Sequence, residues 1–413
     1  MAELARRLGV TDAVLIGLGS MIGAGVFSAF APAAAVAGTG LLVGLGIAAV
    51  VAYCNATASA QLAAQYPESG GTYVYGRRRL GPWWGFLAGW GFVVGKTAGC
   101  AAMALTFAAY AVPGPWQRPV AVAAVAALTA VNYRGVTRTA GLARILVTVA
   151  LVALAVVLVA GWVSGSPDLD RARPAVASGG GYGVLQSAGL LFFAFAGYAR
   201  IATMGEEVRD PARTIPRAIV LALAVAVLVY AAVAGTLLAV LGAGGLAASS
   251  APLAELARGW VVPVVTVGAA AASLGALLAL VAGIGRTTLA MARAGDLPRP
   301  LAAVHPTFRV PHRAEVAVAA AVIVLVLTVD LRGAIGFSSF GVLLYYLVAN
   351  LAAFTQPARH RRFPRALQLL GAAGCLLLVG TLPWQAILAG AVVLGVGVAH
   401  RGARVTWWPR APG

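Results

Sequence analysis

The sequence predicts an all-α polytopic membrane protein with about twelve transmembrane helices. Of its 413 residues, 61% are hydrophobic and only 10% are charged, and the mean hydropathy is +0.90. A soluble fold of this length needs much more polar surface. The apolar residues also fall into runs long enough to cross a bilayer, and the arginines lie mainly between these runs.

Each run of about 20 apolar residues is counted as one span. The spans cover residues 13–37, 40–64, 82–111, 118–134, 140–163, 182–204, 216–242, 259–284, 314–330, 334–356, 366–381 and 383–400. We divide the chain into a cytoplasmic N-terminus (1–12), five helices (13–163), an extracellular loop (164–181), five more helices (182–356), two further helices (357–400) and a cytoplasmic tail (401–413). Because similar runs follow the first, we do not expect it to be a removed signal peptide.

The basic residues predict the orientation of these spans. With both termini in the cytoplasm, 24 arginines fall on the inner side and 5 on the outer side, namely Arg118, Arg171, Arg173, Arg258 and Arg332. This agrees with the positive-inside rule. The net charge of +18 therefore indicates orientation in a lipid bilayer, most simply the cytoplasmic membrane, rather than nucleic-acid binding.

Two spans are interrupted at corresponding places. The first contains GLGSMIGAGVF (17–27), and the sixth contains FFAFAGYAR (192–200). Breaks at the same place in two five-span halves indicate inverted repeats with a binding site at mid-membrane. An unwound helix exposes N–H groups that attract a carboxylate and C=O groups that attract a cation, which suits an amino acid. The alternative for the glycines is close helix packing, since Gly19 and Gly23 have GxxxG spacing.

Four stretches of the chain, in this order, resemble the amino acid–polyamine–organocation superfamily of transporters. They are GSMIGAGVF (19–27), PESGGTYVYGRRRLGPWWGFLAGW (67–90), FFAFAGYARIATMGEEVRDPARTIPRAI (192–219) and RTTLAMARAGDLP (286–298). The resemblance implies a five-plus-five inverted-repeat (LeuT-type) fold. In that fold the substrate lies between broken helices one and six.

The resemblance also implies a set of substrate-binding residues. The amides of Ala24 and Gly25 would bind the substrate carboxylate, with Ser20, Met21 and Gly23 at the preceding unwound turn. The carbonyl groups facing the substrate amino group would be those of Met21, Phe193, Ala194 and Ala196. The rings of Phe193 and Phe195 would cover the substrate, although lipid-facing or packing roles are the alternative for these aromatic residues.

Lys96, the only lysine, lies in the middle of the third span. An ionisable group at that depth is costly and points to function. Positional matching with the family places Lys96 and Cys100 on the face that lines the substrate site. Lys96 is a candidate proton carrier, substrate ligand or fixed charge in place of a coupling cation; a structural lysine bonded to carbonyl groups is the alternative. Its charge disfavours cationic substrates.

The sequence departs from the family at two positions that bear on coupling. Proton-coupled relatives can carry a lysine on span five, where this chain has Leu151 or a neighbour. Relatives often have an acidic residue after the aromatic residue of span six, but here Tyr198 is followed by Ala199 and Arg200. Lys96 is therefore the main titratable candidate at mid-depth.

Residues near the inner end of span six are candidates for a gate. They are Tyr198 and, in GEEVRDPARTIPRAI (205–219), the pair Glu206 and Arg209, whereas Phe193 is a candidate for an outer gate. Ion pairs in this segment can open and close with an inner gate. A solvated loop ordered by local pairs is the alternative, and exposed pairs of this kind contribute little.

These features predict a secondary active transporter for an amino acid, neutral rather than cationic, working by alternating access and driven by proton symport. An exchanger and a polyamine or organic amine permease are alternatives, and a receptor or scaffold on the same fold is a remote one. The chain lacks a P-loop motif, a polar pore lining and a mid-membrane cluster of acids or histidines, which disfavours an ATPase, a channel and an enzyme. Its three cysteines lack metal-site spacing, so we expect no metal or cofactor.

Overall fold

A computed structural model of the chain describes residues 8–67, 70–134, 139–174, 180–202 and 208–407. The described residues are almost entirely helical, and their only β contact is an isolated bridge between Leu8 and Val208. Each of the twelve predicted spans is occupied by helix. The helices are α1 (Val10–Met21), α2 (Ala24–Ser28), α3 (Phe30–Ala37), α4 (Leu41–Gln65), α6 (Pro82–Ala111), α7 (Gln117–Tyr133), α8 (Thr139–Ser164), α9 (Gly180–Phe195), α10 (Ala199–Ala202), α11 (Pro211–Ala248), α13 (Val261–Arg293), α14 (His312–Thr328), α15 (Leu331–Phe354), α16 (Arg365–Thr381) and α17 (Trp384–Trp407).

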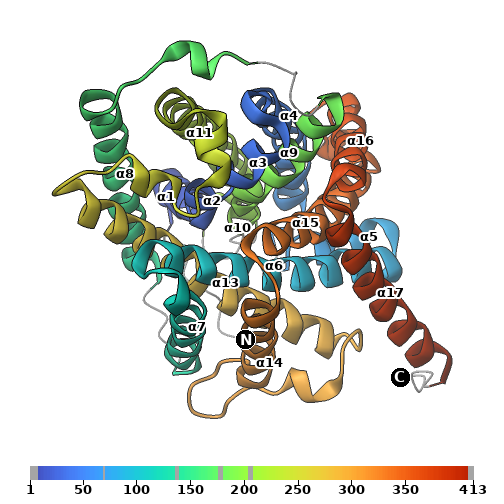
Figure 1. Ribbon diagram of the computed structural model, residues 1–413. Helices are drawn as coiled ribbons and strands as arrows, with labels where there is room; N and C mark the ends of the chain where they lie inside the picture. The colour runs from blue at the N-terminus through green and yellow to red at the C-terminus, as the bar shows by residue number, and fades with distance from the viewer. Residues whose placement is uncertain (1–7, 68–69, 135–138, 175–179, 203–207, 408–413) are drawn as a thin grey trace.

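The prediction of a polytopic membrane protein is confirmed. Within the described ranges, nine helical segments are long and apolar enough to cross a membrane. The helices α7, α14 and α16, which occupy the other three predicted spans, have 17 residues each. In Figure 1 the helices α1, α2 and α10 lie near the middle of the bundle, with α8 and α17 at opposite edges.

Both predicted helix breaks are present. The first separates α1 from α2 at residues 22–23, where Ile22 and Gly23 leave helical geometry. The second follows α9, where residues 196–198 form a 3₁₀ turn before α10 begins. The two breaks touch, because a Cβ placed on Gly197 would lie 2.2 Å from the Ser20 carbonyl oxygen. A glycine is therefore required where the broken helices meet.

Glycines also allow α6 to pack closely against α15. A Cβ on Gly341 would lie 2.5 Å from the carbonyl oxygen of Gly91 and 2.7 Å from the Cα of Gly95. Small residues at such contacts let helix backbones approach, which is how helices associate in a membrane. This packing fixes the third and tenth spans relative to each other and so positions Lys96 on α6.

Two short helices connect the spans. One, α5 (Thr72–Leu80), lies between α4 and α6, and Gly81, with φ of +104°, ends it before Pro82 opens α6. The other, α12 (Pro252–Glu255), lies between α11 and α13.

Candidate functional site

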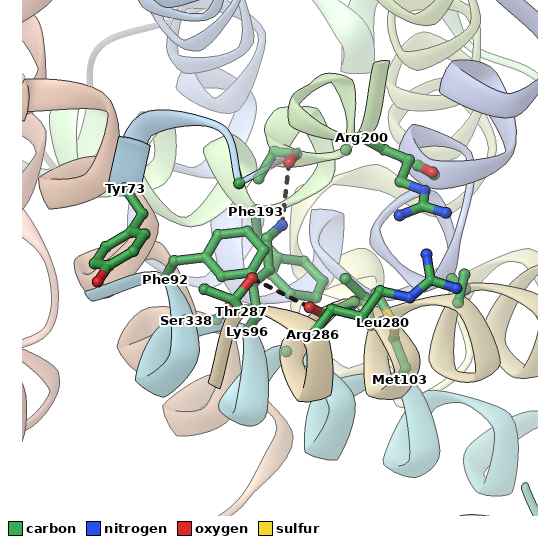
Figure 2. A pocket seen from close by; sticks show the side chains of 18 of the residues that line it. Tyr73, Phe92, Lys96, Met103, Phe193, Arg200, Leu280, Arg286, Thr287 and Ser338 are labelled. Atoms are coloured by element: carbon green, nitrogen blue, oxygen red, sulfur yellow. Dashed lines mark hydrogen bonds between the residues drawn. The ribbon is translucent and has the colours of Figure 1, made fainter. Parts of the chain in front are cut away.

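A cavity of about 180 Å³ lies beside the two helix breaks. Its walls come from the end of α1, the segment 193–200 around the second break, α6, α13 and α15, with Gly70 and α5 at one end. The residues that line it are Ser20, Gly70, Tyr73, Phe92, Lys96, Gly99, Met103, Phe193, Ala196, Gly197, Arg200, Ala276, Ala279, Leu280, Gly283, Arg286, Thr287, Ala290 and Ser338. Figure 2 shows Lys96 and Phe193 between Tyr73 at one end and Arg200 and Arg286 at the other.

The cavity extends from mid-membrane toward one side only. On α13 its lining runs from Ala276, near the helix centre, to Ala290, close to the C-terminal end. On the opposite side of the bundle the Tyr110 hydroxyl donates to the Phe27 carbonyl oxygen (2.9 Å) and accepts from the Leu253 amide (3.2 Å). These bonds tie α6 to α2 and α12 on the side predicted to be extracellular, whereas the cavity lining extends toward the side predicted to be cytoplasmic.

Lys96 connects the cavity to the second break. Its side chain is 8% exposed, and its Nζ donates a hydrogen bond to the Ala196 carbonyl oxygen at 3.1 Å. The Tyr346 hydroxyl lies 3.4 Å from the same oxygen. This carbonyl lies in the 3₁₀ turn of the second break, so the ammonium group bonds the backbone at the break itself. Among the described residues no carboxylate lies within 4.0 Å of Lys96, so its charge is held by a backbone dipole.

The carbonyl groups of both breaks also share a tyrosine. The Tyr230 hydroxyl on α11 lies 2.6 Å from the Met21 oxygen and 2.8 Å from the Ala194 oxygen. It joins the end of α1 to the end of α9. A carbonyl oxygen has two lone pairs, so both groups retain capacity to accept from a ligand.

Four of the predicted binding residues line the cavity: Ser20, Lys96, Phe193 and Ala196. The others do not, and they are Met21, Gly23, Ala24, Gly25, Ala194, Phe195 and Cys100. The start of α2 is instead pressed against its neighbours. A Cβ on Gly25 would lie 2.6 Å from the Ala194 Cα, and one on Gly23 would lie 2.9 Å from the Ala276 Cβ. These two glycines therefore mark a break and also serve close helix packing.

The remaining aromatic and thiol candidates are buried in the helix core. The Phe195 ring contacts the Tyr230 ring edge-on, with centroids 4.9 Å apart. Cys100, one turn after Lys96, lies in the apolar contact between α6 and its neighbours α7 and α14. Neither side chain is brought to the cavity.

The gate candidates occupy different places. The Phe193 ring lines the cavity, whereas the buried Tyr198 ring stacks on Tyr346 with centroids 4.9 Å apart. Arg209 is exposed, and its amide bonds the Leu8 carbonyl oxygen at 2.9 Å. Glu206 lies outside the residues that the structure describes, so the predicted pair with Arg209 stays a prediction.

Sequence reasoning missed several residues of the site. Tyr230 stands alone among aliphatic residues in VLVYAAVAG, and that isolation is the only signal that marks it. Arg286 opens the quoted stretch RTTLAMARAGDLP, but nothing in that stretch indicates that it reaches the cavity. The apolar lining residues Met103 and Leu280 belong to long apolar runs, and nothing in such a run distinguishes a residue that faces a cavity from one that faces a neighbouring helix.

Comparison with known proteins gives one matching family. The sequence model of the amino acid permease family matches residues 8–402. An uncharacterized transporter of Mycobacterium tuberculosis is 61% identical over 406 residues, which cover 97% of this chain and 92% of that protein.

More distant relatives carry substrate names. A branched-chain amino acid permease of Bacillus subtilis is 26% identical over 432 residues, covering 96% of this chain and 92% of that protein. The human cationic amino acid transporter 4 is 29% identical over 372 residues, covering 83% of this chain and 58% of that protein.

Proposed function

This chain belongs to the amino acid permease family, and we propose that it is a secondary active transporter that moves a neutral amino acid across the cytoplasmic membrane by alternating access. The observation that supports this most strongly is the meeting of two helix breaks at one cavity that opens to one side only. A mid-membrane site between broken helices is the arrangement used by transporters built from inverted repeats. In this proposal both termini lie in the cytoplasm, and the cavity lies on the cytoplasmic side of the two breaks.

The lining of the cavity favours neutral over cationic substrates. Its charged side chains in the described chain are Lys96, Arg200 and Arg286, and no acidic residue lines it. At mid-depth the walls are formed mainly by Phe92, Met103, Phe193 and Leu280. An apolar amino acid side chain fits such walls, whereas a second positive charge near Lys96 is repelled in a poorly hydrated site. The name of the Bacillus subtilis branched-chain permease agrees with this choice, and that of human cationic amino acid transporter 4 does not.

Uptake into proteoliposomes tests both parts of the proposal. A panel of labelled amino acids is offered with and without an inward proton gradient. We expect leucine or another neutral amino acid to accumulate, and the gradient to increase its accumulation. A preference for arginine contradicts the proposed neutral substrate class. If no amino acid enters the vesicles, the proposed transport activity is wrong. Stimulation only by internal amino acid supports the exchanger instead.

Lys96 is the proposed coupling residue. Its ammonium group bonds a backbone carbonyl oxygen, and among the described residues it pairs with no carboxylate. Cycling of this proton would make and break the bond to Ala196, and so link protonation to the second break.

We predict that Lys96→Met, which keeps the length of the side chain, abolishes accumulation driven by the proton gradient. Exchange of labelled for unlabelled amino acid should continue in this variant, because exchange needs no net proton movement. Counterflow and gradient-driven uptake are measured on the same vesicles. Full accumulation by Lys96→Met removes Lys96 as the proton carrier.

A further inference from the structure

Glu315, in the first turn of α14, is a buried carboxyl group outside the predicted site. It is 2% exposed, and its Oε2 has no hydrogen-bond partner among the described residues. The side chain packs directly on the backbone of α13, since a Cβ on Gly285 would lie 2.8 Å from the Glu315 Cγ. Glutamate is almost never buried to this extent without a partner.

An ionised carboxylate in this position is costly. Leaving a charge buried without a partner loses its hydration, and only an ion pair or protonation offsets the loss. Within 4.0 Å of the Glu315 carboxylate, the described part of the chain provides no basic nitrogen. In this structure the neutral, protonated group is the form that fits the surroundings.

Arg286 is the residue that connects Glu315 to the cavity. It follows Gly285 on α13, lines the cavity, and is an electrostatic neighbour of the carboxyl group. Its guanidinium group forms no ion pair among the described residues. Arg286 thus stands between a cavity that receives substrate and a buried acid that lacks a partner.

The other titratable and charged groups near this end of α14 are Tyr133, His305, His312 and the exposed Arg313. The rings of Tyr133, at the end of α7, His305 and His312 contact one another, and His312 lies one turn before Glu315 on α14. His312 Nδ1 is buried and unpartnered within the described residues. Arg299 lies on the short turn that follows α13.

We propose that Glu315 is a proton-binding site behind the inner half of the cavity. A proton from cytoplasmic water binds Oε2 while Arg286 stands in the cavity, and it returns to that water when Arg286 turns and pairs with the carboxylate. The guanidinium keeps its charge throughout. Protonation of Glu315 therefore determines whether the Arg286 guanidinium group lies in the cavity, where it can pair with the carboxylate of an amino acid. This use of the site rests on the proposed transport function; the proton site itself does not.

Difference infrared spectroscopy tests the proton site without any transport. Spectra of the purified protein are compared between about pH 5 and about pH 9, and a protonated carboxyl group is read from its C=O stretch. We expect one titrating acid band to be present in the wild type and absent from Glu315→Gln. The control Glu255→Gln, at the opposite end of the bundle, should retain this band. Identical acid bands in the wild type and Glu315→Gln overturn the proposal.

Transport provides the second readout. Exchange of a neutral amino acid is measured while only the pH on the cytoplasmic side is varied. A single titrating group changes its occupied fraction about tenfold across about two pH units, so we expect a change of up to about tenfold in wild type and Glu255→Gln. Glu315→Gln and Arg286→Gln should lose most of this dependence.

The two proposals can fail separately. If the wild type moves no amino acid but the infrared band disappears in Glu315→Gln, the transport function is wrong and the proton site stands. If Glu315→Gln is folded, transports, and keeps both the band and the wild-type pH dependence, the proton site is wrong and the transport function stands.

Discussion

At the scale of single residues, the site is organised around backbone oxygens rather than around acidic side chains. Lys96 satisfies the Ala196 oxygen, and the Tyr230 hydroxyl lies between those of Met21 and Ala194. Two side chains thereby hold the ends of three helical pieces. Each free carbonyl in an apolar interior otherwise carries a desolvation cost.

We predict that Tyr230→Phe destabilises the protein by about 1–3 kcal/mol, because two buried carbonyl groups lose the single hydroxyl donor that they share. The measurement is the apparent unfolding temperature of purified protein in detergent. Tyr53→Phe, on the exposed face of α4, is the matched control and should leave that temperature unchanged. Equal temperatures for Tyr230→Phe and the wild type would show that the hydroxyl is not needed at the breaks.

Which site residues were predictable from the sequence depends on how local their signal is. Lys96 is found because a lone charge in an apolar run is conspicuous, and Ser20 because glycines surround it. Tyr230 lies 209 positions from Met21, and no local pattern reports a contact over that distance. In the sequence, Glu315 is an ordinary acidic residue at the start of a helix. Only its burial, which the structure shows, makes it unusual.

At the scale of helices, the broken elements serve two purposes at once. The apolar lengths predicted the spans, and the glycines predicted the breaks, because both signals are local in sequence. The spacing of the glycines left packing and ligand binding open. The structure places Gly25 against α9, away from the cavity, so in this state α2 is held by packing.

We predict that Gly25→Ala separates α2 from α9 and slows amino acid exchange. Its Cβ would lie 2.6 Å from the Ala194 Cα, and overpacking of this kind costs about 1–3 kcal/mol. Gly46→Ala is the control, since a Cβ there meets nothing within 4 Å and helix propensity favours alanine by about 1 kcal/mol. Counterflow rates that fall equally in both variants, or in neither, contradict this account of α2.

At the scale of the whole molecule, one buried carboxylate ties both halves of the chain together on the open side. Asp296, 3% exposed after the end of α13, accepts from the Tyr73 hydroxyl at 2.8 Å and pairs with Arg77 at 2.9 Å, both on α5. It also pairs with Arg401 on α17, which is 7% exposed and stacks over Trp83 and Phe86. The last helix is thereby anchored beside the entrance of the cavity.

We predict that Asp296→Asn destabilises the protein by about 3–5 kcal/mol, because Arg401 is left buried without its counter-ion. Asp170→Asn is the control: its pair with Arg173 is exposed, and such pairs contribute about 0–1 kcal/mol. Thermal unfolding in detergent compares the two variants. If Asp296→Asn lowers the unfolding temperature no more than Asp170→Asn does, the ion pair between Asp296 and Arg401 does not anchor α17.

The central claim is that an amino acid binds in the cavity where the two breaks meet, and substrate protection of a single cysteine tests it most directly. Ser20→Cys places a thiol in the cavity, while Cys54, Cys100 and Cys375 are buried. We predict that a membrane-impermeant thiol reagent labels Ser20→Cys from the cytoplasmic side, and that leucine, but not arginine, slows the labelling. Ser164→Cys, exposed at the other end of the bundle, should be labelled from the outside at the same rate with or without leucine. Labelling of Ser20→Cys that no amino acid slows would contradict the account.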